Sequence, residues 1–524
     1  MTSLNADMEL LPDRIAETFT GVKVLVTGGT GFMGKVLVEK VLRQCPDINQ
    51  IYLLVRSKKG KNPRQRLEEI FNGPLFEKLR DMRGGLEPLL EKVTIISGDV
   101  SEPDLALSEA DRQLIVDQVN IIIHAAATVR FDEELKKAVL LNTRGTKLIV
   151  ELGKQCRNLK LFMHISTAYC HLYEKLLEEK AYPPPADPHK IIEVMEWMDD
   201  ETIAAATPKL LNNYPNTYAF TKALGEAIVV EAMNDNLPAM MLRPSIVIPI
   251  WQGPVPGWTD NLNGPTGLLI GAGKGVLRSM YCKGNSYADY MPVDVFVSII
   301  MICAWNYLKN GDTKSNIINS TTSAEVKVTW SEMIETGREI ITNRIPLNGV
   351  VWYPGGSMKT SRLHHNICVF LFHWIPAYIV DTLLFCLGYK PVLCRVHRRI
   401  TKGFEVFEYY TNNQWDFKSD IVQALRTKLN AREKIDYKVD SEGLDITKYF
   451  EDCIKAARLY ILKEYDDTLP AARRHMKVMY CVDVITKCIF WGLLLYWFSG
   501  IVMSPFSSTT IEPSEAPTVI AMKA

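Results

Sequence analysis

The chain has 524 residues, which is more than one ordinary domain needs and enough to bury two hydrophobic cores. Its 60 basic and 60 acidic residues balance, so the net charge gives no support for a nucleic-acid-binding protein. Its 11 cysteines form no C-x-x-C pair and its histidines no H-x-x-x-H pair, which favours reduced thiols in a cytosol-facing protein over a disulfide framework or a zinc site.

The N-terminal segment carries charge before any apolar run begins. Asp7, Glu9 and Asp13 all lie within the first 14 residues, a pattern that excludes a secretory signal peptide. We therefore expect the main body of the protein to stay in the cytosol, and we expect no metal site.

Residues 22–40 have the pattern of a strand, a tight turn and a helix. An apolar β-branched run covers residues 22–26, glycines follow at 28, 31 and 34, and helical apolar spacing begins at Phe32. A helix N-terminus attracts anions, and glycine lets the backbone approach a pyrophosphate. The pattern predicts a dinucleotide site rather than an ordinary βα turn, and its G-x-x-G-x-x-G spacing resembles the extended short-chain dehydrogenase/reductase family.

The second predicted strand, residues 50–55, ends in Arg56. At this position a free ribose 2′-hydroxyl requires Asp or Glu, whereas a 2′-phosphate requires arginine. Arg56, followed by Ser57, Lys58 and Lys59, therefore predicts NADP(H) rather than NAD(H). The alternative is a solvated basic loop.

Two further strands are expected to end beside the cofactor. After a charged helical insertion over residues 63–90, the strand at 93–96 leads to Asp99 and Val100, where Asp99 is placed to accept a hydrogen bond from the adenine amino group. The strand at 119–127 ends in Ala125 and Ala126, which are small enough for phosphates and ribose to lie across them. We interpret His124 as a packed side chain.

Helices are expected over residues 131–141 and 142–156, and Asn142 resembles the asparagine that helps hold the active-site lysine in this family. The strand at 161–165 follows and ends in Ser166 and Thr167. Hydroxyls at this edge of a doubly wound sheet open onto the ligand crevice. Either hydroxyl is placed to donate to a substrate carbonyl, and the pattern does not choose between them.

Tyr218 and Lys222 form the central catalytic pair. Their i, i+4 spacing places both on one face of a helix that runs to residue 233. There the ammonium group can lower the pKa of the phenol and hold the nicotinamide ribose, so that Tyr218 can exchange a proton at neutral pH. An exposed chance pair is the alternative, but the preceding glycine turn and Ser-Thr strand end argue against it.

The rest of the first domain completes this pattern. A Pro-rich loop precedes an acidic helix over residues 190–206, and a last strand covers 239–247, where Arg243, Pro244 and Ser245 resemble the corner that lies near the nicotinamide. Residues 250–285 read as a flexible loop on the substrate side, and a helix over 295–307 closes the fold. We expect one α/β Rossmann domain with a doubly wound parallel sheet over residues 15–354.

A mostly helical domain is expected over residues 355–470. Its basic cluster is either a contact for phospholipid head groups or coenzyme A phosphates, or a solvated helix face; the cluster comprises Arg395, His397, Arg398, Arg399 and Lys402. The apolar run at 367–388 predicts a buried or membrane-embedded helical hairpin, with a globular core as the alternative.

The C-terminal apolar segment, residues 478–503, predicts a membrane anchor, although its charge-free part is shorter than the ~20 residues usually needed. Arg473, Arg474 and Lys477 precede it, as expected on a cytoplasmic flank. The alternative is a buried amphipathic helix. Residues 504–524 are rich in Ser, Thr and Pro and are expected to be disordered.

Taken together, the motifs resemble the fatty acyl-CoA reductases over about residues 15–503. The residues that carry the resemblance are T-G-G-T-G-F-M-G at 27–34, L-L-V-R at 53–56, H-I-S-T-A-Y at 164–169, the Tyr218/Lys222 pair and the apolar helical C-terminal region. The resemblance implies NADPH-dependent reduction of a long-chain fatty acyl-CoA to a primary alcohol. It also implies a membrane-associated protein of the endoplasmic reticulum or the peroxisome.

The resemblance implies a cofactor site and a catalytic set. The cofactor-binding residues are Thr27, Gly28, Gly29, Thr30, Gly31, Phe32, Met33, Gly34, Arg56, Asp99, Val100, Ala125, Ala126, Asn142, Lys222, Pro244 and Ser245, and the catalytic residues are Tyr218, Lys222, Thr167 and Ser166.

Two other functions remain open. One is a membrane-bound hydroxysteroid or sugar-nucleotide oxidoreductase, which commonly uses NAD(H), so that Arg56 and the long helical region argue against it. The other is a membrane tether that binds NADPH without turnover, against which the intact Tyr218/Lys222 pair argues.

Overall fold

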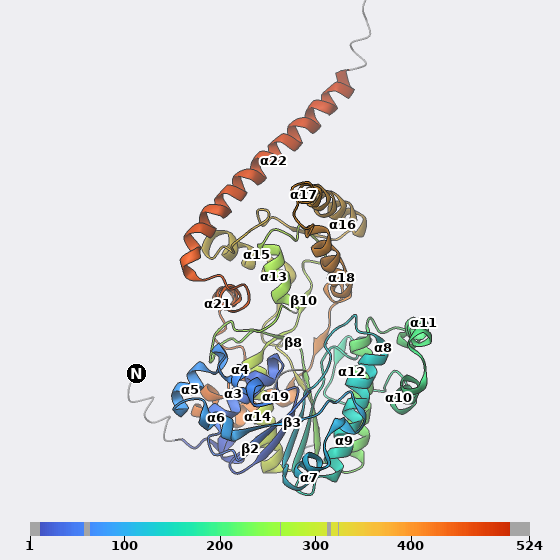
Figure 1. The fold of residues 1–524 in the computed structure, drawn as a ribbon, viewed down its shortest axis with the longest axis vertical. Coiled ribbons are helices and arrows are strands. Elements are labelled where there is room, and N and C mark those ends of the chain that lie inside the picture. Colours follow the sequence, from blue (N-terminus) through green and yellow to red (C-terminus); the bar gives the residue numbers. More distant parts are fainter. Residues whose placement is uncertain (1–10, 57–62, 263, 312–315, 323, 504–524) are drawn as a thin grey trace, which may run out of the picture.

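The computed structural model describes residues 11–56, 63–262, 264–311, 316–322 and 324–503 (Figure 1). Its centre is a seven-stranded parallel sheet with strand order β12-β7-β5-β4-β1-β2-β3. The strands are β1 (Lys23–Thr27), β2 (Gln50–Val55), β3 (Val93–Ser97), β4 (Ile121–His124), β5 (Leu161–Ile165), β7 (Ala239–Pro244) and β12 (Ile317–Ser320). Because strands are added outward on both sides of β1, the predicted doubly wound sheet is confirmed.

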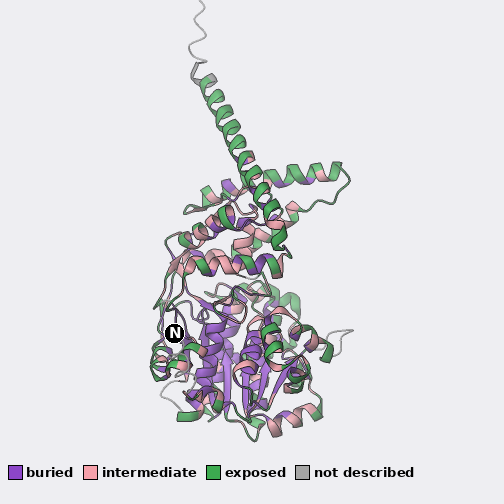
Figure 2. Cartoon of the chain, turned by 90° about the vertical axis from the view of Figure 1, so that its left-hand side faces the viewer, coloured by how far each residue is buried: buried purple, intermediate pink, exposed green. Residues whose placement is uncertain are grey.

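Helices cover both faces of this sheet. Successive side chains of β1 point to opposite faces, so Val24 and Val26 pack with helices α3 (Phe32–Gln44) and α14 (Val293–Asn310), and Leu25 lies in the other core with α9 (Gly145–Gln155) and α12 (Thr217–Asn234). The other helices of this sheet lobe are α2 (Arg14–Thr18), α4 (Pro63–Phe71), α5 (Glu77–Arg83), α6 (Glu87–Lys92), α7 (Glu109–Gln118), α8 (Leu135–Ala138), α10 (Pro188–Trp197) and α11 (Asp200–Leu211). Figure 2 shows the buried strands at the centre of the lobe.

Several predicted elements need correction. The strand expected over 119–127 ends at His124, and the alanines form a loop. The acidic helix over 190–206 is two helices, because Asp199 caps the start of α11. The strand over 239–247 breaks after Pro244, and β8 (Ile246–Ile248) pairs instead with β11 (Tyr290–Pro292). Strand β12 was missed because its apolar run is only Ile317 and Ile318.

A helical lobe stands at the carboxyl edge of the sheet (Figure 1). Its elements are α13 (Pro265–Gly273), β9 (Ser279–Tyr281), β10 (Tyr287–Ala288), β13 (Val328–Thr329), α15 (Trp330–Glu339), β14 (Ser357–Lys359), α16 (Arg362–Val369), α17 (Ile375–Cys386), α18 (Leu393–Asn412), α21 (Ile446–Ala456) and α22 (Leu469–Met503). The prediction of a flexible loop over residues 250–285 is therefore wrong in part, because α13 and β9 lie within this range. Strand β9 is fixed by parallel pairing with β14.

The chain crosses between the lobes more than once. Strand β15 (Asp416–Phe417) pairs with β6 (Leu176–Leu177), and α19 (Asp420–Lys428) packs on α14. Next, α20 (Ala431–Asp436) is tied to the N-terminal region by an ion pair between Arg14 and Glu433. The domain boundary at residues 354/355 stays a prediction. Some segments before it, such as α13, belong to the helical lobe, and some after it, such as α19, pack on the sheet lobe.

Two helices are long and apolar enough to cross a membrane: Arg362–Cys386 and Asp466–Ser499. The first is one continuous helical run through a π-helical turn at Phe370–Trp374, so the predicted hairpin within 367–388 is wrong. Only 22% of its apolar window is buried, which also overturns the alternative of a globular core. In the second helix every described side chain of residues 484–499 is exposed, so it is not a buried core helix (Figure 2). The tail at 504–524 lies outside the described residues.

Candidate active site

The turn between β1 and α3 is a cradle of backbone atoms. Gly28 has a φ of +75°, and a Cβ there would lie 2.9 Å from the backbone of Ala125 and Ala126. A Cβ on Gly34 would lie 2.3 Å from the Gly28 carbonyl oxygen, so only glycine allows this close packing. Gly31 is the exposed N-cap of α3 and brings no side chain to cap it. The free helix N-terminus fits the pyrophosphate of a dinucleotide.

Thr27 supports this cradle from beneath. Its side chain is fully buried, its Oγ1 lies 2.7 Å from His124 Nδ1, and it accepts hydrogen bonds from the backbone N–H groups of Ala125 and Ala126. His124 also contacts Thr146 Oγ1, and burial lowers the pKa of His124 to about 3. Thr27 and His124 therefore hold the alanine loop in place, as expected for a packed histidine.

The remainder of the turn is partly exposed and partly packed against β2. Thr30, Phe32 and Met33 are partly exposed at the start of α3, whereas Gly29 is buried against Leu53, with 2.7 Å between its ideal Cβ position and Leu53 Cδ2. The turn thus presents its backbone on one side and packs against β2 on the other.

The predicted adenine and ribose contacts lie at the ends of β2 and β3. Asp99 Oδ1 accepts hydrogen bonds from the backbone N–H and the hydroxyl of Ser101, and Val100 is buried against Gly145. Arg56 is exposed at the end of β2, and its carbonyl oxygen accepts a hydrogen bond from Arg66 on α4. Arg66 was not singled out in the sequence, because only the fold brings it to Arg56. Ser57, Lys58 and Lys59 lie outside the described residues.

The structure brings Thr167, rather than Ser166, to Tyr218. A hydrogen bond from Thr167 lowers the pKa of Tyr218, although burial dominates and raises it above the usual value for tyrosine. The Ser166 hydroxyl instead lies 4.0 Å from the Cys170 sulfur. Position therefore favours Thr167, and which of the two hydroxyls acts in catalysis stays a prediction.

Lys222 is buried one turn after Tyr218. Its Nζ donates a 2.7 Å hydrogen bond to the Ile165 carbonyl oxygen at the end of β5, and burial lowers the pKa of Lys222 to about 8. The ammonium group is thus held at the end of β5, and the lowering of the phenol's pKa by Lys222 stays a prediction.

Asn142 supports the catalytic helix next to the lysine. It lies in a π-helical turn (Val139–Arg144) and accepts a hydrogen bond from the Thr128 backbone. Its Nδ2 donates to Thr221 Oγ1 at 3.0 Å, one residue before Lys222. Asn142 thus connects the loop after β4 to α12 without bonding the lysine itself.

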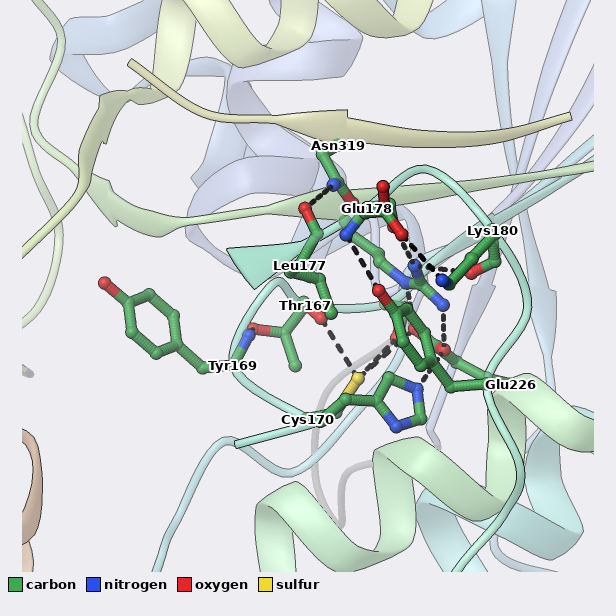
Figure 3. A network of polar contacts seen from close by, with 12 residues as sticks. Thr167, Tyr169, Cys170, Leu177, Glu178, Lys180, Glu226 and Asn319 are labelled. Carbon is green, nitrogen blue, oxygen red and sulfur yellow. Dashed lines mark hydrogen bonds and ion pairs between the residues drawn. The ribbon is translucent and has the colours of Figure 1, made fainter. Parts of the chain in front are cut away.

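A buried charged network lies behind the site (Figure 3). Arg243, which was expected near the nicotinamide, is fully buried and binds both carboxylate oxygens of Glu226 at 2.9 and 2.7 Å. His171 Nε2 contacts the same carboxylate at 2.7 Å, and the Cys170 thiol donates to it at 3.3 Å. Burial alone would lower the pKa of His171, but Cys170 and Glu226 raise it to about 10.

This network explains why three potential metal ligands lie close together. Cys170, His171 and Glu226 could together hold an ion, but the guanidinium of Arg243 already neutralises the carboxylate. The network has a structural role. Arg243 also donates hydrogen bonds to the carbonyl oxygens of Glu178 and Lys180, and it thereby fixes the chain that follows β5. Pro244 and Ser245 follow at the buried end of β7, and Ser245 Oγ has no partner among the described residues.

The helical lobe contributes to the wall of the site. The Phe131 ring lies 5.5 Å from that of Tyr218 and 5.3 Å from that of Tyr410 on α18. Asn216 caps α12 through Ala219 N–H and donates a 2.9 Å hydrogen bond to the Tyr410 hydroxyl. The start of the catalytic helix is thus attached to the second lobe, which the sequence pattern did not indicate.

Comparisons with known proteins agree with this arrangement. An NAD-binding family model described as "male sterility protein" matches residues 26–300, and a second model with the same description matches residues 372–464. The first match supports a nicotinamide dinucleotide as the cofactor. Among solved structures, the terminal reductase domain of the myxalamid biosynthetic pathway shares the fold, with a TM-score of 0.54 at 18% identity over 88% of this chain and 99% of that one.

Curated relatives cover nearly the whole chain. Fatty acyl-CoA reductase 1 of Rattus norvegicus is 40% identical over 486 residues, which are 92% of this chain and 93% of the relative. Fatty acyl-CoA reductase wat of Drosophila melanogaster is 37% identical over 470 residues, 90% of each chain. Since both the sheet lobe and the helical lobe are matched at this identity, the chain belongs to the fatty acyl-CoA reductase family.

Proposed function

We propose that this protein reduces a long-chain fatty acyl-CoA to a primary alcohol, with NADPH as hydride donor and release of coenzyme A. The observation that carries the proposal is the grouping of Thr167, Tyr218 and Lys222 just after β5, in a chain that also has the glycine cradle and is 40% identical to a fatty acyl-CoA reductase. Four electrons are required, so two NADPH are consumed for each alcohol formed.

The hydroxyls of Tyr218 and Thr167 bind the carbonyl oxygen of the thioester. NADPH, when bound over the glycine turn, would supply the hydride that the carbonyl carbon accepts. As negative charge develops on the oxygen, the two hydroxyls stabilise it through charge-assisted hydrogen bonds. Collapse of this oxyanion expels the coenzyme A thiolate and leaves an aldehyde.

The same groups serve the second reduction. Tyr218 donates a proton to the aldehyde oxygen as a second hydride arrives, and the alcohol forms. Lys222, at the cofactor side of α12, would hold the nicotinamide ribose. No step requires a cysteine nucleophile.

Two arginines support NADPH over NADH. Arg56 directly follows β2, at the position where a 2′-phosphate favours arginine, and Arg66 donates a hydrogen bond to the Arg56 carbonyl oxygen. Neither position offers the carboxylate that a free ribose 2′-hydroxyl would require.

A membrane attachment through the C-terminal region fits the two exposed apolar helices. Arg473, Arg474 and Lys477 precede the apolar part of α22, which favours a cytosolic catalytic body. The endoplasmic reticulum and the peroxisome are the membranes we propose.

The first test measures NADPH oxidation by the detergent-solubilised full chain with palmitoyl-CoA, with aldehyde and alcohol separated. We expect about two NADPH per alcohol, and we expect Tyr218→Phe to lose at least ~10²-fold in kcat, because a general acid contributes about that much, while NADPH binding is kept. Release of aldehyde alone would reduce the reaction to one hydride step. Undiminished turnover by Tyr218→Phe would remove that residue from the mechanism.

A further inference from the structure

Two apolar chambers surround helix α13 in the helical lobe. The first encloses about 1050 Å³ of empty space, part of it open to solvent, and is lined by residues that include Ile248, Leu269, Tyr290, Met333, Leu444 and Ile454. The second encloses about 770 Å³, also partly open to solvent, and is lined by residues that include Leu268, Ala272, Leu277, Trp330, Gly337 and Phe404. Mostly apolar linings of this kind are typical of ligand sites.

The chambers are neighbours. Four residues line both of them: Pro265, Leu269, Met333 and Ile341. Tyr290 of the first chamber meets Trp330 of the second edge-to-face, with ring centroids 6.0 Å apart. Helices α13 and α15 pack closely at this wall, since a Cβ on Gly337 would lie 2.4 Å from Leu269 Cδ1.

Their linings suit a hydrocarbon. No charged side chain lines the first chamber in the described part of the chain, and in the second the one charged group, Arg338, donates to the Gly356 carbonyl oxygen. The Tyr449 hydroxyl is likewise satisfied by Pro249 at 2.8 Å. Among the residues that line the two chambers, the described structure leaves only the Tyr290 hydroxyl and the Trp330 N–H buried without a partner, and the rings of these two residues meet at the junction.

Their position connects the sheet edge with the apolar helices. The first chamber is lined by Ile248 of β8, three residues after Ser245 at the end of β7. The second reaches Phe404 on α18, which follows the exposed helix α17. Figure 1 shows α13 between β8 on one side and α16 and α17 on the other.

We propose that the two chambers hold the acyl chain of the substrate, an inference that rests on the proposed function. The carbons nearest the thioester occupy the first chamber, and the terminal carbons of the longest chains pass the α13–α15 wall into the second. Residues of the second chamber then set the upper limit of chain length, and Ala272, which lines the second chamber only, is a specificity-determining position.

The test compares Ala272→Phe with its matched control Ala272→Ser in the full-length protein. Values of kcat/KM are measured for lauroyl-, palmitoyl- and stearoyl-CoA. We expect Ala272→Phe to lower kcat/KM at least tenfold with stearoyl-CoA and less than twofold with lauroyl-CoA. Ala272→Ser should keep the wild-type dependence of kcat/KM on chain length. Leu444→Trp, in the first chamber, should lower kcat/KM for all three substrates.

Equilibrium binding of the same acyl-CoAs gives a readout without turnover. One outcome is that the wild type reduces none of these acyl-CoAs while Ala272→Phe still weakens the binding of stearoyl-CoA alone. In that case the proposed function fails, and the two chambers stand as the binding site of the acyl chain. An unchanged chain-length profile in Ala272→Phe, or an equal loss for all lengths with a folded protein, overturns the inference.

Discussion

At the scale of single residues, the site combines buried charge with hydroxyls whose roles depend on their neighbours. Lys222 is 3% exposed and donates to one carbonyl oxygen, so its ammonium is poorly solvated. Thr167 and Ser166 are adjacent in sequence, yet only Thr167 reaches Tyr218.

Lys222→Met should give a protein that is inactive but more stable at neutral pH. Burial lowers the pKa of Lys222 from 10.5 to about 8. That difference corresponds to about 3 kcal/mol of destabilisation, and loss of the Ile165 hydrogen bond offsets about 1 kcal/mol of the gain. We expect a net stabilisation on the order of 2 kcal/mol for the cofactor-free protein at pH 7, measured by thermal or denaturant unfolding.

The pH dependence of this difference has a definite sign. The folded chain releases the Lys222 proton near pH 8 and the unfolded chain near 10.5, so the wild type gains stability relative to Lys222→Met as the pH rises between these values. The gap should therefore be narrower at pH 9.5 than at pH 7. A variant less stable than the wild type at pH 7 would contradict the assignment of a buried ammonium.

Arg56→Ala and Arg66→Ala test the choice of cofactor. Each removes a cation from the end of β2, and a charge-assisted hydrogen bond contributes about 1.5–3 kcal/mol. We expect the KM for NADPH to rise by roughly tenfold or more for Arg56→Ala and less for Arg66→Ala, with the KM for NADH unchanged. Equal increases for both cofactors would show that these arginines do not read the 2′-phosphate.

At the scale of elements, α22 has two parts with different surroundings. Its first half packs on the helical lobe, where Asp483 accepts a hydrogen bond from Trp352 and lies 3.5 Å from Arg278. Asp483 is the acidic residue that interrupts the apolar run in the sequence. Its contacts with Trp352 and Arg278 explain how the structure accommodates this charge. Residues 488–499 have no such contacts among the described residues, and their side chains are exposed.

Removal of residues 488–524 should separate membrane attachment from catalysis. The truncation keeps Asp483 and its partners, so the helical lobe should stay folded. We expect the truncated protein to be extracted from membranes by alkaline carbonate, whereas the full chain resists extraction. kcat/KM for palmitoyl-CoA in detergent should change less than threefold. Carbonate resistance after truncation would shift the anchor to α16 and α17.

At the scale of the whole molecule, two lobes share one active site. The Asn216–Tyr410 hydrogen bond joins residues 194 positions apart and attaches the start of α12 to α18. The cofactor cradle lies wholly in the sheet lobe, while the proposed acyl chambers lie in the helical lobe. Substrate chain and cofactor thus approach Tyr218 from different lobes.

The sequence by itself determined the doubly wound sheet, the cofactor turn, the Tyr218/Lys222 pair and the exposed C-terminal apolar helix. These features are encoded locally, because each depends on residues only a few positions apart. The local patterns are a glycine spacing, an i, i+4 pair and hydrophobic runs of fixed period. The strand at 317–320 escaped because its apolar run is too short to carry such a signal.

Only the tertiary structure decided which hydroxyl meets Tyr218, that Arg66 joins Arg56, and that Arg243 is bound to Glu226. It also showed that the apolar run near 370 is one exposed helix, and that residues 265–273 form the wall of two chambers. Each of these depends on contacts between distant parts of the chain. Such contacts leave no local period in the sequence, since they arise only when the elements pack.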